Sequence, residues 1–357
     1  MPTKPEIYLR RLRTVRERLS QLPADGLFAT PSSNLFYLTG VDFHRSERLT
    51  ALLLFQDRDP VMICPAFEAS RLRNMSAVSE VVTWEETEDP FARAGGLFPA
   101  AAGTLAVEPS TAYDDVERLL RARPGWKATS AASTFGALRM VKSADELEMM
   151  RHAIEVALPR FRRAFEALRP GCLESEISAL VGGENMVQFG PSSAYPHGAS
   201  GSTPLSRDQA VLIDAWDRPD GYFYDITRST FYGTPTDEYR KVWSIVLDAQ
   251  SAAIDRAAPG VPCSEVDAAA RKVIEKAGYG EYFTHRLGHG LGIDVHEAPY
   301  MVGHDRTILE PGMTFTSEPG IYLPGRFGVR IEDDIVCTDK GAASLSPRVT
   351  ALEPIAA

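Results

Sequence analysis

Two stretches of the chain repeat one pattern, and this repeat restricts the fold most. "RPGCLESEIS" at 169–178 is matched by "APGVPCSEVD" at 258–267. In both copies an amphipathic helix ends at Pro-Gly and another helix begins. Strand-like segments then follow each copy. Two similar halves packed together would enclose a cleft, so the repeat predicts a domain of two related halves with a site between them. A chance match between two short segments is the alternative.

A smaller α/β domain is expected before the repeat. Residues 5–22 have apolar side chains at helical spacing. "GLFAT" (26–30) and "NLFYLTG" (34–40) are interpreted as strands, and 49–65 as a hairpin closed by "QDRD". A boundary in the region 130–142 gives an N-terminal domain of 1–135 and a C-terminal domain of 136–357. Beyond it, Ser143 and Glu146 form a capping-box pattern that opens a long helix, which Pro159 should kink.

Charge and cysteine content exclude several classes of protein. The net charge of −10 argues against nucleic-acid and anionic-membrane partners, which need a basic surface. The first residues are charged where a signal peptide needs an apolar core. Four isolated cysteines form no CxxC pair, so neither a disulfide framework nor a thiolate zinc site is expected. A reduced, cytoplasmic protein is therefore predicted.

Acidic residues recur inside two β-rich hairpin patterns. In 211–231 a turn at Pro219–Gly221 predicts a hairpin in which Asp214 and Asp225 lie opposite one another. In 313–336 the turn at Pro324-Gly325 places Glu318 and Glu332 opposite one another. Unpaired carboxylates in such apolar surroundings are costly. Solvated strand acids are the alternative, but their occurrence in both halves favours a divalent metal site.

Three histidines, His285, His289 and His296, fall within "THRLGHGLGIDVHE". The spacing of the first two matches a helical HExxH zinc motif, but the glutamate is missing. Three intervening glycines also disfavour a helix. An extended segment packed tightly beside the site is expected instead, with at least one histidine as a metal ligand.

These segments resemble the M24 "pita-bread" metallopeptidases, specifically the Xaa-Pro peptidases prolidase and aminopeptidase P. The matching blocks are "YPHG", "LIDAWDRPDGYFYDITR", "HRLGHGLGIDVHE", "TSEPGIY" and "GVRIEDDIV", in the family's order. "NLFYLTG" resembles the family's N-terminal domain. The resemblance implies an α+β fold, with a C-terminal pita-bread domain of pseudo-twofold repeated halves preceded by a smaller α/β N-terminal domain.

The resemblance also implies two divalent metal ions per subunit and a homodimer. The implied ligands are Asp214, Asp225, His289, Glu318 and Glu332. Asp225 and Glu332 would bridge the ions, Asp214 would complete one, and His289 and Glu318 the other. Oxygen-rich coordination with one imidazole suits Mn²⁺, with Co²⁺ and Zn²⁺ as alternatives.

The implied reaction is two-metal hydrolysis of the bond before proline in an Xaa-Pro peptide. Glu318 would carry the proton to the leaving nitrogen. His197 and His296 would bind substrate and stabilise the oxyanion, and Arg330 would orient the carboxylates. His285 would either hold a ligand in place or serve as a core histidine. His44, His152 and His304 are interpreted as surface or packing residues, and Asp217, Asp333 and Asp334 as turn or supporting acids.

A dipeptidase must also bind the C-terminal carboxylate of its substrate. Many prolidases carry an arginine soon after the "HE" pair, but this chain has Tyr300 there. Arg45 and Arg48 follow "YLTG" in a loop of the N-terminal domain and are the expected replacement, since guanidinium binds carboxylate in bidentate fashion. A solvated loop or a dimer contact are the alternatives for this segment.

Other members of the same fold family are alternatives to a prolidase. Aminopeptidase P, which acts on longer Xaa-Pro peptides, is the nearest. Creatinase shares the fold without metals, and methionine aminopeptidase normally lacks so large an N-terminal domain. A binding module on an inactive pita-bread fold would have lost ligands or active-site histidines, and this chain keeps both sets.

Overall fold

The computed structural model describes residues 5–19 and 23–356. The chain divides into two compact parts, unit 1 (Met1–Leu138) and unit 2 (Arg139–Ala357). The division falls within α6 (Ala132–Met140), the helix that also contains the domain boundary predicted between residues 135 and 136. None of the described helices combines the length and the apolar character that crossing a bilayer requires.

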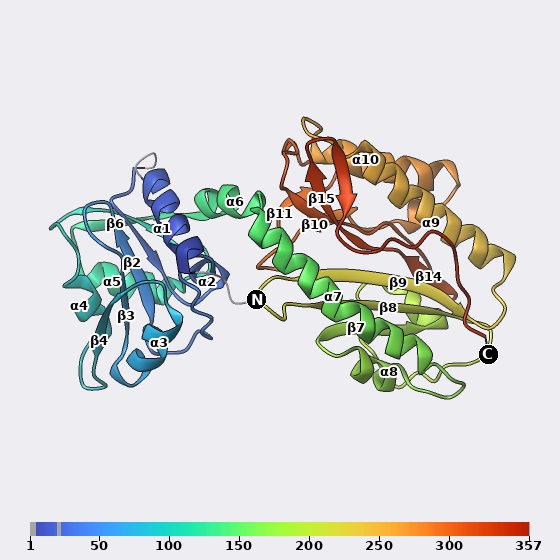
Figure 1. The fold of residues 1–357 in the computed structure, drawn as a ribbon, viewed down its shortest axis with the longest axis horizontal. Helices are drawn as coiled ribbons and strands as arrows, with labels where there is room; N and C mark the ends of the chain where they lie inside the picture. The colour runs from blue at the N-terminus through green and yellow to red at the C-terminus, as the bar shows by residue number, and fades with distance from the viewer. Residues whose placement is uncertain (1–4, 20–22, 357) are drawn as a thin grey trace. The chain divides into compact units, whose positions relative to one another are not determined.

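Unit 1 is built on one mixed sheet with helices around it (Figure 1). Its strands have the order β4-β3-β2-β1-β5-β6, where β1 is Gly26–Ala29, β2 Ala51–Phe55, β3 Val61–Pro65, β4 Glu80–Trp84, β5 Gly103–Val107 and β6 Trp126–Ser130. Its helices before α6 are α1 (Pro5–Leu19), α2 (Ser33–Thr39), α3 (Ala69–Met75), α4 (Pro90–Gly95) and α5 (Tyr113–Ala122), with the 3₁₀ turn η1 (Ala66–Glu68). The antiparallel pairing of β2 with β3 confirms the predicted hairpin.

The prediction of a strand at "NLFYLTG" is wrong, because these residues form the helix α2. Ser32 caps the helix, its side chain accepting from the backbone N–H of Leu35, and Gly40 ends it in a left-handed conformation with φ of 79°. The apolar run fits either period, so the two cap residues decide the outcome.

Unit 2 consists of two halves, each of which begins with two helices and continues into strands. The first half runs through α7 (Ala144–Glu166), α8 (Glu174–Val181), β7 (Glu184–Phe189), η2 (Gly190–Ala194), β8 (Gln209–Asp217) and β9 (Tyr224–Tyr232). The second runs through α9 (Asp237–Arg256), α10 (Cys263–Lys276), η3 (Gly280–Tyr282), β10 (Gly288–Gly290), β11 (Glu297–Met301), β12 (Thr314–Ser317), β13 (Gly320–Leu323), β14 (Phe327–Arg330), β15 (Asp333–Thr338) and β16 (Gly341–Ser344). A helix pair followed by a sheet in each half confirms the predicted repeat.

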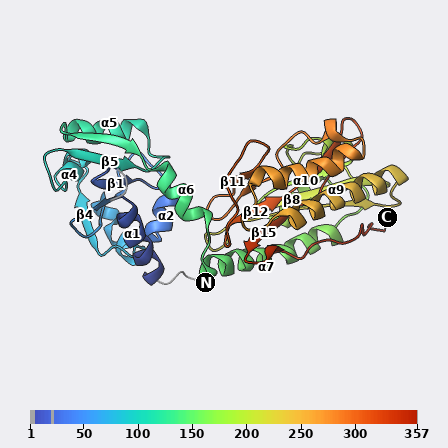
Figure 2. The same ribbon diagram turned by 90° about the horizontal axis from the view of Figure 1, so that it is seen from above.

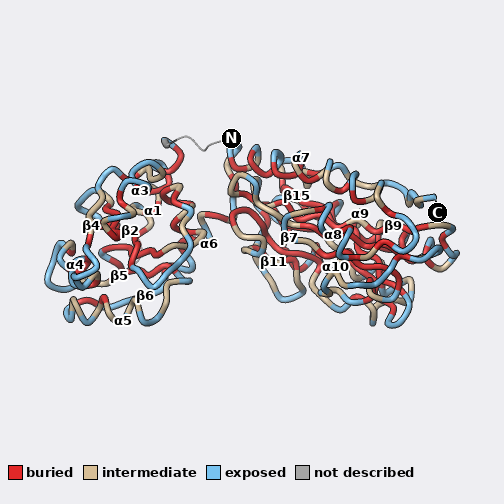
Figure 3. Tube along the Cα trace, turned by 90° about the horizontal axis from the view of Figure 1, so that it is seen from below, coloured by how far each residue is buried: buried red, intermediate tan, exposed pale blue. Residues whose placement is uncertain are grey.

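Each half buries a core of its own between its helix pair and its strands. Side chains from α7, α8 and β7–β9 form one apolar cluster, and those from α9, α10 and the later strands form another, which Ala210 of β8 and Phe231 of β9 join. The helices α9 and α10 lie side by side (Figures 1 and 2). The strands of unit 2 are largely buried, and exposed stretches concentrate on the outer helices and loops (Figure 3). The ionisable residues on these strands are therefore removed from water.

The long helix α7 begins as predicted. The Ser143 side chain accepts from the backbone N–H of Glu146, whose carboxylate accepts from the backbone N–H of Ser143 at 2.8 Å. Pro159 lies inside the helix. The helix thus starts at a capping box directly after the unit boundary.

The predicted facing of Asp214 and Asp225 is wrong in register. Asp214 pairs with Thr227, and Asp225 with Trp216. The connection between β8 and β9 extends from residue 218 to 223, so its centre lies one residue later than the symmetric turn that the sequence suggested. The two aspartates are diagonal neighbours on one face, which still brings them toward the same side of the sheet.

Candidate metal centre and active site

A cavity of about 660 Å³ in unit 2 gathers most of the predicted site residues. Its lining comes from both halves of unit 2. Among the lining residues are the five predicted ligands and four other predicted site residues: Asp214, Asp225, His289, Glu318, Glu332, His197, His285, His296 and Arg330. Segments as distant in sequence as β8 and β14 thus meet at one cavity.

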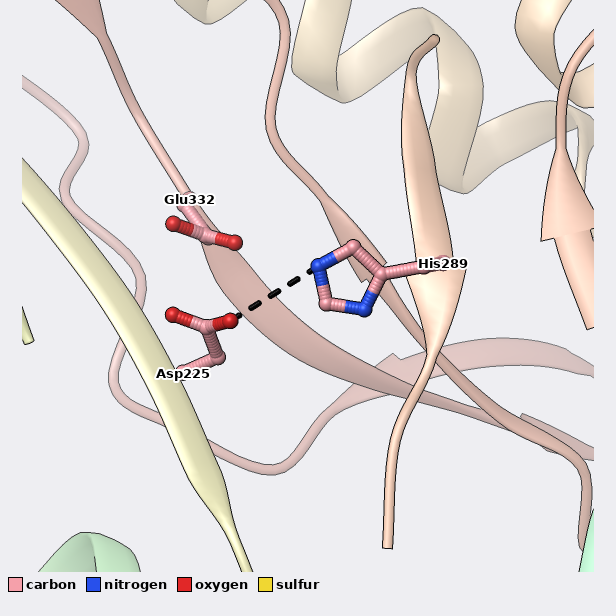
Figure 4. Close-up of side chains that lie close together, drawn as sticks. All are labelled: Asp225, His289 and Glu332. Carbon is pink, nitrogen blue, oxygen red and sulfur yellow. Dashed lines mark ion pairs between the residues drawn. The ribbon is translucent and has the colours of Figure 1, made fainter. Parts of the chain in front are cut away.

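Asp225, His289 and Glu332 form a group in this cavity that could hold a metal ion. One ligand atom from each side chain lies within 4.8 Å of the others, and all three residues are buried. Figure 4 shows the two carboxylates next to each other and facing the imidazole, with Nε2 of His289 3.7 Å from Oδ2 of Asp225. Asp225 comes from β9, His289 from β10, and Glu332 from the segment between β14 and β15.

The extended conformation predicted around His289 is confirmed by β10. A Cβ at Gly288 would collide with the carbonyl of Thr316, and one at Gly290 with the backbone of Ala298. The backbone N–H of His289 donates to Oγ1 of Thr316 at 3.1 Å. The glycines therefore allow neighbouring strands to close on the histidine and fix its position.

Asp214 is held by a chain of hydrogen bonds that reaches His285. Oδ2 of Asp214 accepts from Nη2 of Arg330 at 2.7 Å. Nη1 of Arg330 donates to the Tyr322 hydroxyl at 2.9 Å, and that hydroxyl lies 2.8 Å from Nε2 of His285. His285 is thus connected to the carboxylate of Asp214 through Tyr322 and Arg330.

Glu318 lies beside the imidazole of His289. Its Oε1 is 3.3 Å from Nε2 of His289 and accepts from Oγ1 of Thr316 at 3.0 Å. Burial opposes ionisation of this carboxyl, but the hydrogen bond and positive charge of His289 outweigh it and lower its pKa to about 2. Glu318 is thus the acid of the cluster that ionises most readily.

The remaining acids of the cluster lack sufficient counter-charge. Burial, reinforced by neighbouring carboxylates, raises the pKa of Asp225 and of Glu332 well above their usual values. Burial also raises the pKa of Asp214, against the opposing effect of Arg330. Oδ1 of Asp214 is buried without a hydrogen-bond partner in the described structure. One guanidinium cannot balance four carboxylates, so this donor set fits divalent cations.

Two histidines lie at the exposed rim of the cavity. The ring of His296 is 4.1 Å from that of His289 with the planes at 87°. Burial, followed by the charges of His289 and Arg286, lowers the pKa of His296 to about 4, so its imidazole is neutral at pH 7. His197 is carried by the loop after η2. Both side chains remain accessible to a substrate.

Sequence reasoning missed the residue that holds the His197 loop. The buried carboxylate of Glu174 accepts from the backbone N–H of Phe189 at 2.8 Å and from that of Gly201 at 2.9 Å. It therefore fastens both ends of the segment that contains His197. A buried acid at a helix start, next to the repeated Pro-Gly, was the available signal.

The other predicted residues occupy different surroundings. Arg45 and Arg48 belong to unit 1, where both are exposed and Nε of Arg48 binds Oε1 of Glu86 at 2.9 Å. Asp217 pairs with Arg160 at 2.9 Å, Asp333 pairs with Arg228 at 2.7 Å, and Asp334 accepts from the backbone N–H of Asp225 at 3.2 Å. His152 is 3.2 Å from Asp220, whereas His44 and His304 are exposed.

Comparison with known proteins finds the same two parts. Residues 148–339 match metallopeptidase family M24, and residues 11–141 match the creatinase/prolidase N-terminal domain. A putative dipeptidase of Bacillus subtilis is 37% identical over 354 residues, which cover 95% of this chain and 98% of that protein.

Two solved structures are similar over nearly the whole chain. The crystal structure of a dipeptidase from Mycobacterium ulcerans has a TM-score of 0.93 and 34% identity, and covers 100% of both chains. That of a recombinant prolidase from Thermococcus sibiricus has a TM-score of 0.90 and 33% identity, covering 98% of this chain and 99% of that one.

Proposed function

The chain belongs to metallopeptidase family M24, and on that basis we propose that it is an Xaa-Pro dipeptidase, a prolidase. The resemblance that the sequence motifs indicated is confirmed, and so is the pita-bread fold with its smaller N-terminal domain. The protein is a metallopeptidase and therefore a hydrolase. Its family implies divalent metal ions, and its relatives include proteins named dipeptidase and prolidase.

One observation supports the proposal most strongly: five donor side chains of the expected types line one cavity. We assign Asp214, Asp225, His289, Glu318 and Glu332 as the residues that hold two divalent ions. When bound, the ions supply the positive charge that activates water and polarises the scissile carbonyl. Oxygen donors with one imidazole favour Mn²⁺ over Zn²⁺ or Co²⁺.

The chain's own residues then bind substrate and move protons. His197 and His296 lie at the rim, where their ring N–H groups can donate to the carbonyl oxygen before proline as negative charge develops there. As the C–N bond breaks and a C–O bond forms, Glu318 transfers the proton of the attacking water to the proline nitrogen. Arg330 keeps Asp214 in place through the bond described above.

Substrate length is the point on which prolidase and aminopeptidase P differ. Metal-free protein supplemented with Mn²⁺ is expected to hydrolyse Ala-Pro faster than Ala-Pro-Ala. Faster cleavage of the tripeptide would favour aminopeptidase P. If metal-loaded protein hydrolyses neither peptide, the Xaa-Pro activity is rejected, and an inactive binding module becomes the favoured function.

A cytoplasmic location and a homodimer complete the proposal. The cysteines Cys64, Cys172, Cys263 and Cys337 are all buried and free, which suits a reducing compartment. The dimer rests on family resemblance alone, and light scattering of the full chain at several concentrations tests it.

A further inference from the structure

The cavity contains two arginines, and only one is committed to the protein. Arg330 is buried and donates to Thr227, Pro196, Tyr322 and Asp214. Arg286 also lines the cavity. It is partly exposed, and no carboxylate of the described residues forms an ion pair with it. A guanidinium without an acid partner at an acidic centre is available for an anion from outside.

Arg286 is nevertheless held in place. Its guanidinium carbon lies 4.7 Å from the centre of the Tyr300 ring, a stacking contact that limits the side chain's freedom. Tyr300 on β11 is the direct cross-strand partner of His289 on β10. The same ladder that carries a proposed metal ligand therefore also carries the ring on which Arg286 stacks.

We propose that Arg286 binds the C-terminal carboxylate of the Xaa-Pro dipeptide and thereby sets the preference for dipeptides, an inference that rests on the proposed function. A dipeptide ends one residue after the scissile bond, so its carboxylate lies within about 3.5 Å of chain length from that bond. The planar guanidinium can hold both carboxylate oxygens at once. Met186, Trp216 and Val295 supply apolar lining to the same cavity for the proline ring.

This assignment differs from the one expected from sequence, which placed the carboxylate on Arg45 or Arg48. Arg48 is already bound to Glu86 and Glu47 within unit 1. Arg48 would have to leave these carboxylates to bind a substrate, whereas Arg286 would not have to break an ion pair with any described residue. The sequence alone did not distinguish Arg286, because Arg286 stands within a histidine motif and Tyr300, on which it stacks, lies fourteen positions later.

The test compares Ala-Pro with its C-terminal amide, which keeps the scissile bond and removes the charge. Two charge-assisted hydrogen bonds are worth a factor of about 100. Arg286→Ala should lower kcat/KM for Ala-Pro about 100-fold and lower it far less for the amide, so that the ratio between the two substrates collapses. Arg286→Lys should recover part of the ratio. Arg306→Ala is the matched control, since Arg306 lies near Tyr300 but does not line the cavity.

Binding of the product gives a readout that needs no turnover. By calorimetry, wild-type protein should bind proline more tightly than prolinamide, and Arg286→Ala should remove that difference. Equal losses for both ligands, or an unchanged ratio, would overturn the proposal. An unchanged ratio in Arg286→Ala together with a collapsed ratio in Arg48→Ala would show that Arg48, and not Arg286, binds the substrate carboxylate. If wild-type protein cleaves neither substrate yet shows the proline preference, the proposed function fails while the anion site stands.

Discussion

Nη2 of Arg330 donates to Oδ2 of Asp214 at 2.7 Å, and this ion pair joins the two halves of unit 2. Asp214 lies on β8 in the first half, and Arg330 ends β14 in the second. Both residues are buried. The contact therefore serves two purposes, since it links the repeated halves and fixes one carboxylate of the metal centre.

Breaking this pair should destabilise the protein. Arg330→Met leaves Asp214 buried without its charged partner, which should lower the free energy of unfolding by about 3–5 kcal/mol. Urea denaturation of metal-free protein measures it. Arg326→Ala is the control on the same hairpin, because its ion pair with Glu238 is half exposed and worth less than about 1 kcal/mol. Equal destabilisation by both variants would show that the pair has no special role.

Removing one carboxylate of the cluster should separate metal binding from folding. Asp225→Asn relieves repulsion among buried acids, so metal-free protein should keep or raise its Tm. The rise in Tm on adding Mn²⁺ should disappear, because a ligand stabilises only the state it binds. Activity should fall about 1,000-fold or more, as for loss of a group that acts mainly in the transition state. Asp217→Asn, outside the cluster, should retain both the Tm rise and activity, and a retained Tm rise in Asp225→Asn would refute the ligand assignment.

The loop that carries His197 should depend on Glu174. Glu174→Gln cannot accept from both backbone N–H groups, so His197 should be displaced and kcat/KM should fall by about 10–100-fold. Mn²⁺ affinity should stay the same, since the loop contains no proposed ligand. Glu176→Gln serves as control, because Glu176 is exposed and its contacts, with the backbone N–H of Leu173 and with Arg169, lie outside the His197 loop. A loss of Mn²⁺ affinity in Glu174→Gln would instead indicate general unfolding of the site.

Glu297 should make the stability of unit 2 depend on pH. Burial opposes its ionisation, but Lys142 and Arg139 outweigh burial and lower the pKa of Glu297. Because the folded-state pKa lies below the usual value, the stabilisation is present above about pH 4.5 and is lost as pH falls through the lowered value. Glu297→Gln should cost about 3 kcal/mol at pH 7, with the difference from wild type shrinking below pH 4. A difference that stays constant from pH 7 to pH 3 would contradict this account.

The sequence predicted which residues line the cavity better than it predicted strand register and secondary structure. The four acids could be predicted because each stands in a β-rich hairpin pattern, whereas only the family resemblance selected His289 from the three clustered histidines. The structure brings all five side chains to one cavity. The register of Asp214 could not be predicted, since a turn whose centre moves by one residue changes every cross-strand partner. The helix at "NLFYLTG" was missed because its caps, Ser32 and Gly40, outweigh an ambiguous apolar pattern.

Residues that act through distant partners were also out of reach of sequence reasoning. Glu174 holds a loop that ends at Gly201, and Arg286 stacks on a ring from another strand. Neither contact has a fixed spacing, because it depends on how the strands pair. These relationships appear only when the two halves of unit 2 are folded together.

Anomalous diffraction from crystals of the full chain grown with Mn²⁺ tests the central assignment most directly. Two anomalous peaks are expected in the cavity, with Asp225 and Glu332 touching both, Asp214 touching one, and His289 and Glu318 touching the other. Peaks bound by other side chains, or a cavity without any anomalous signal at saturating Mn²⁺, would contradict the metallopeptidase site described here.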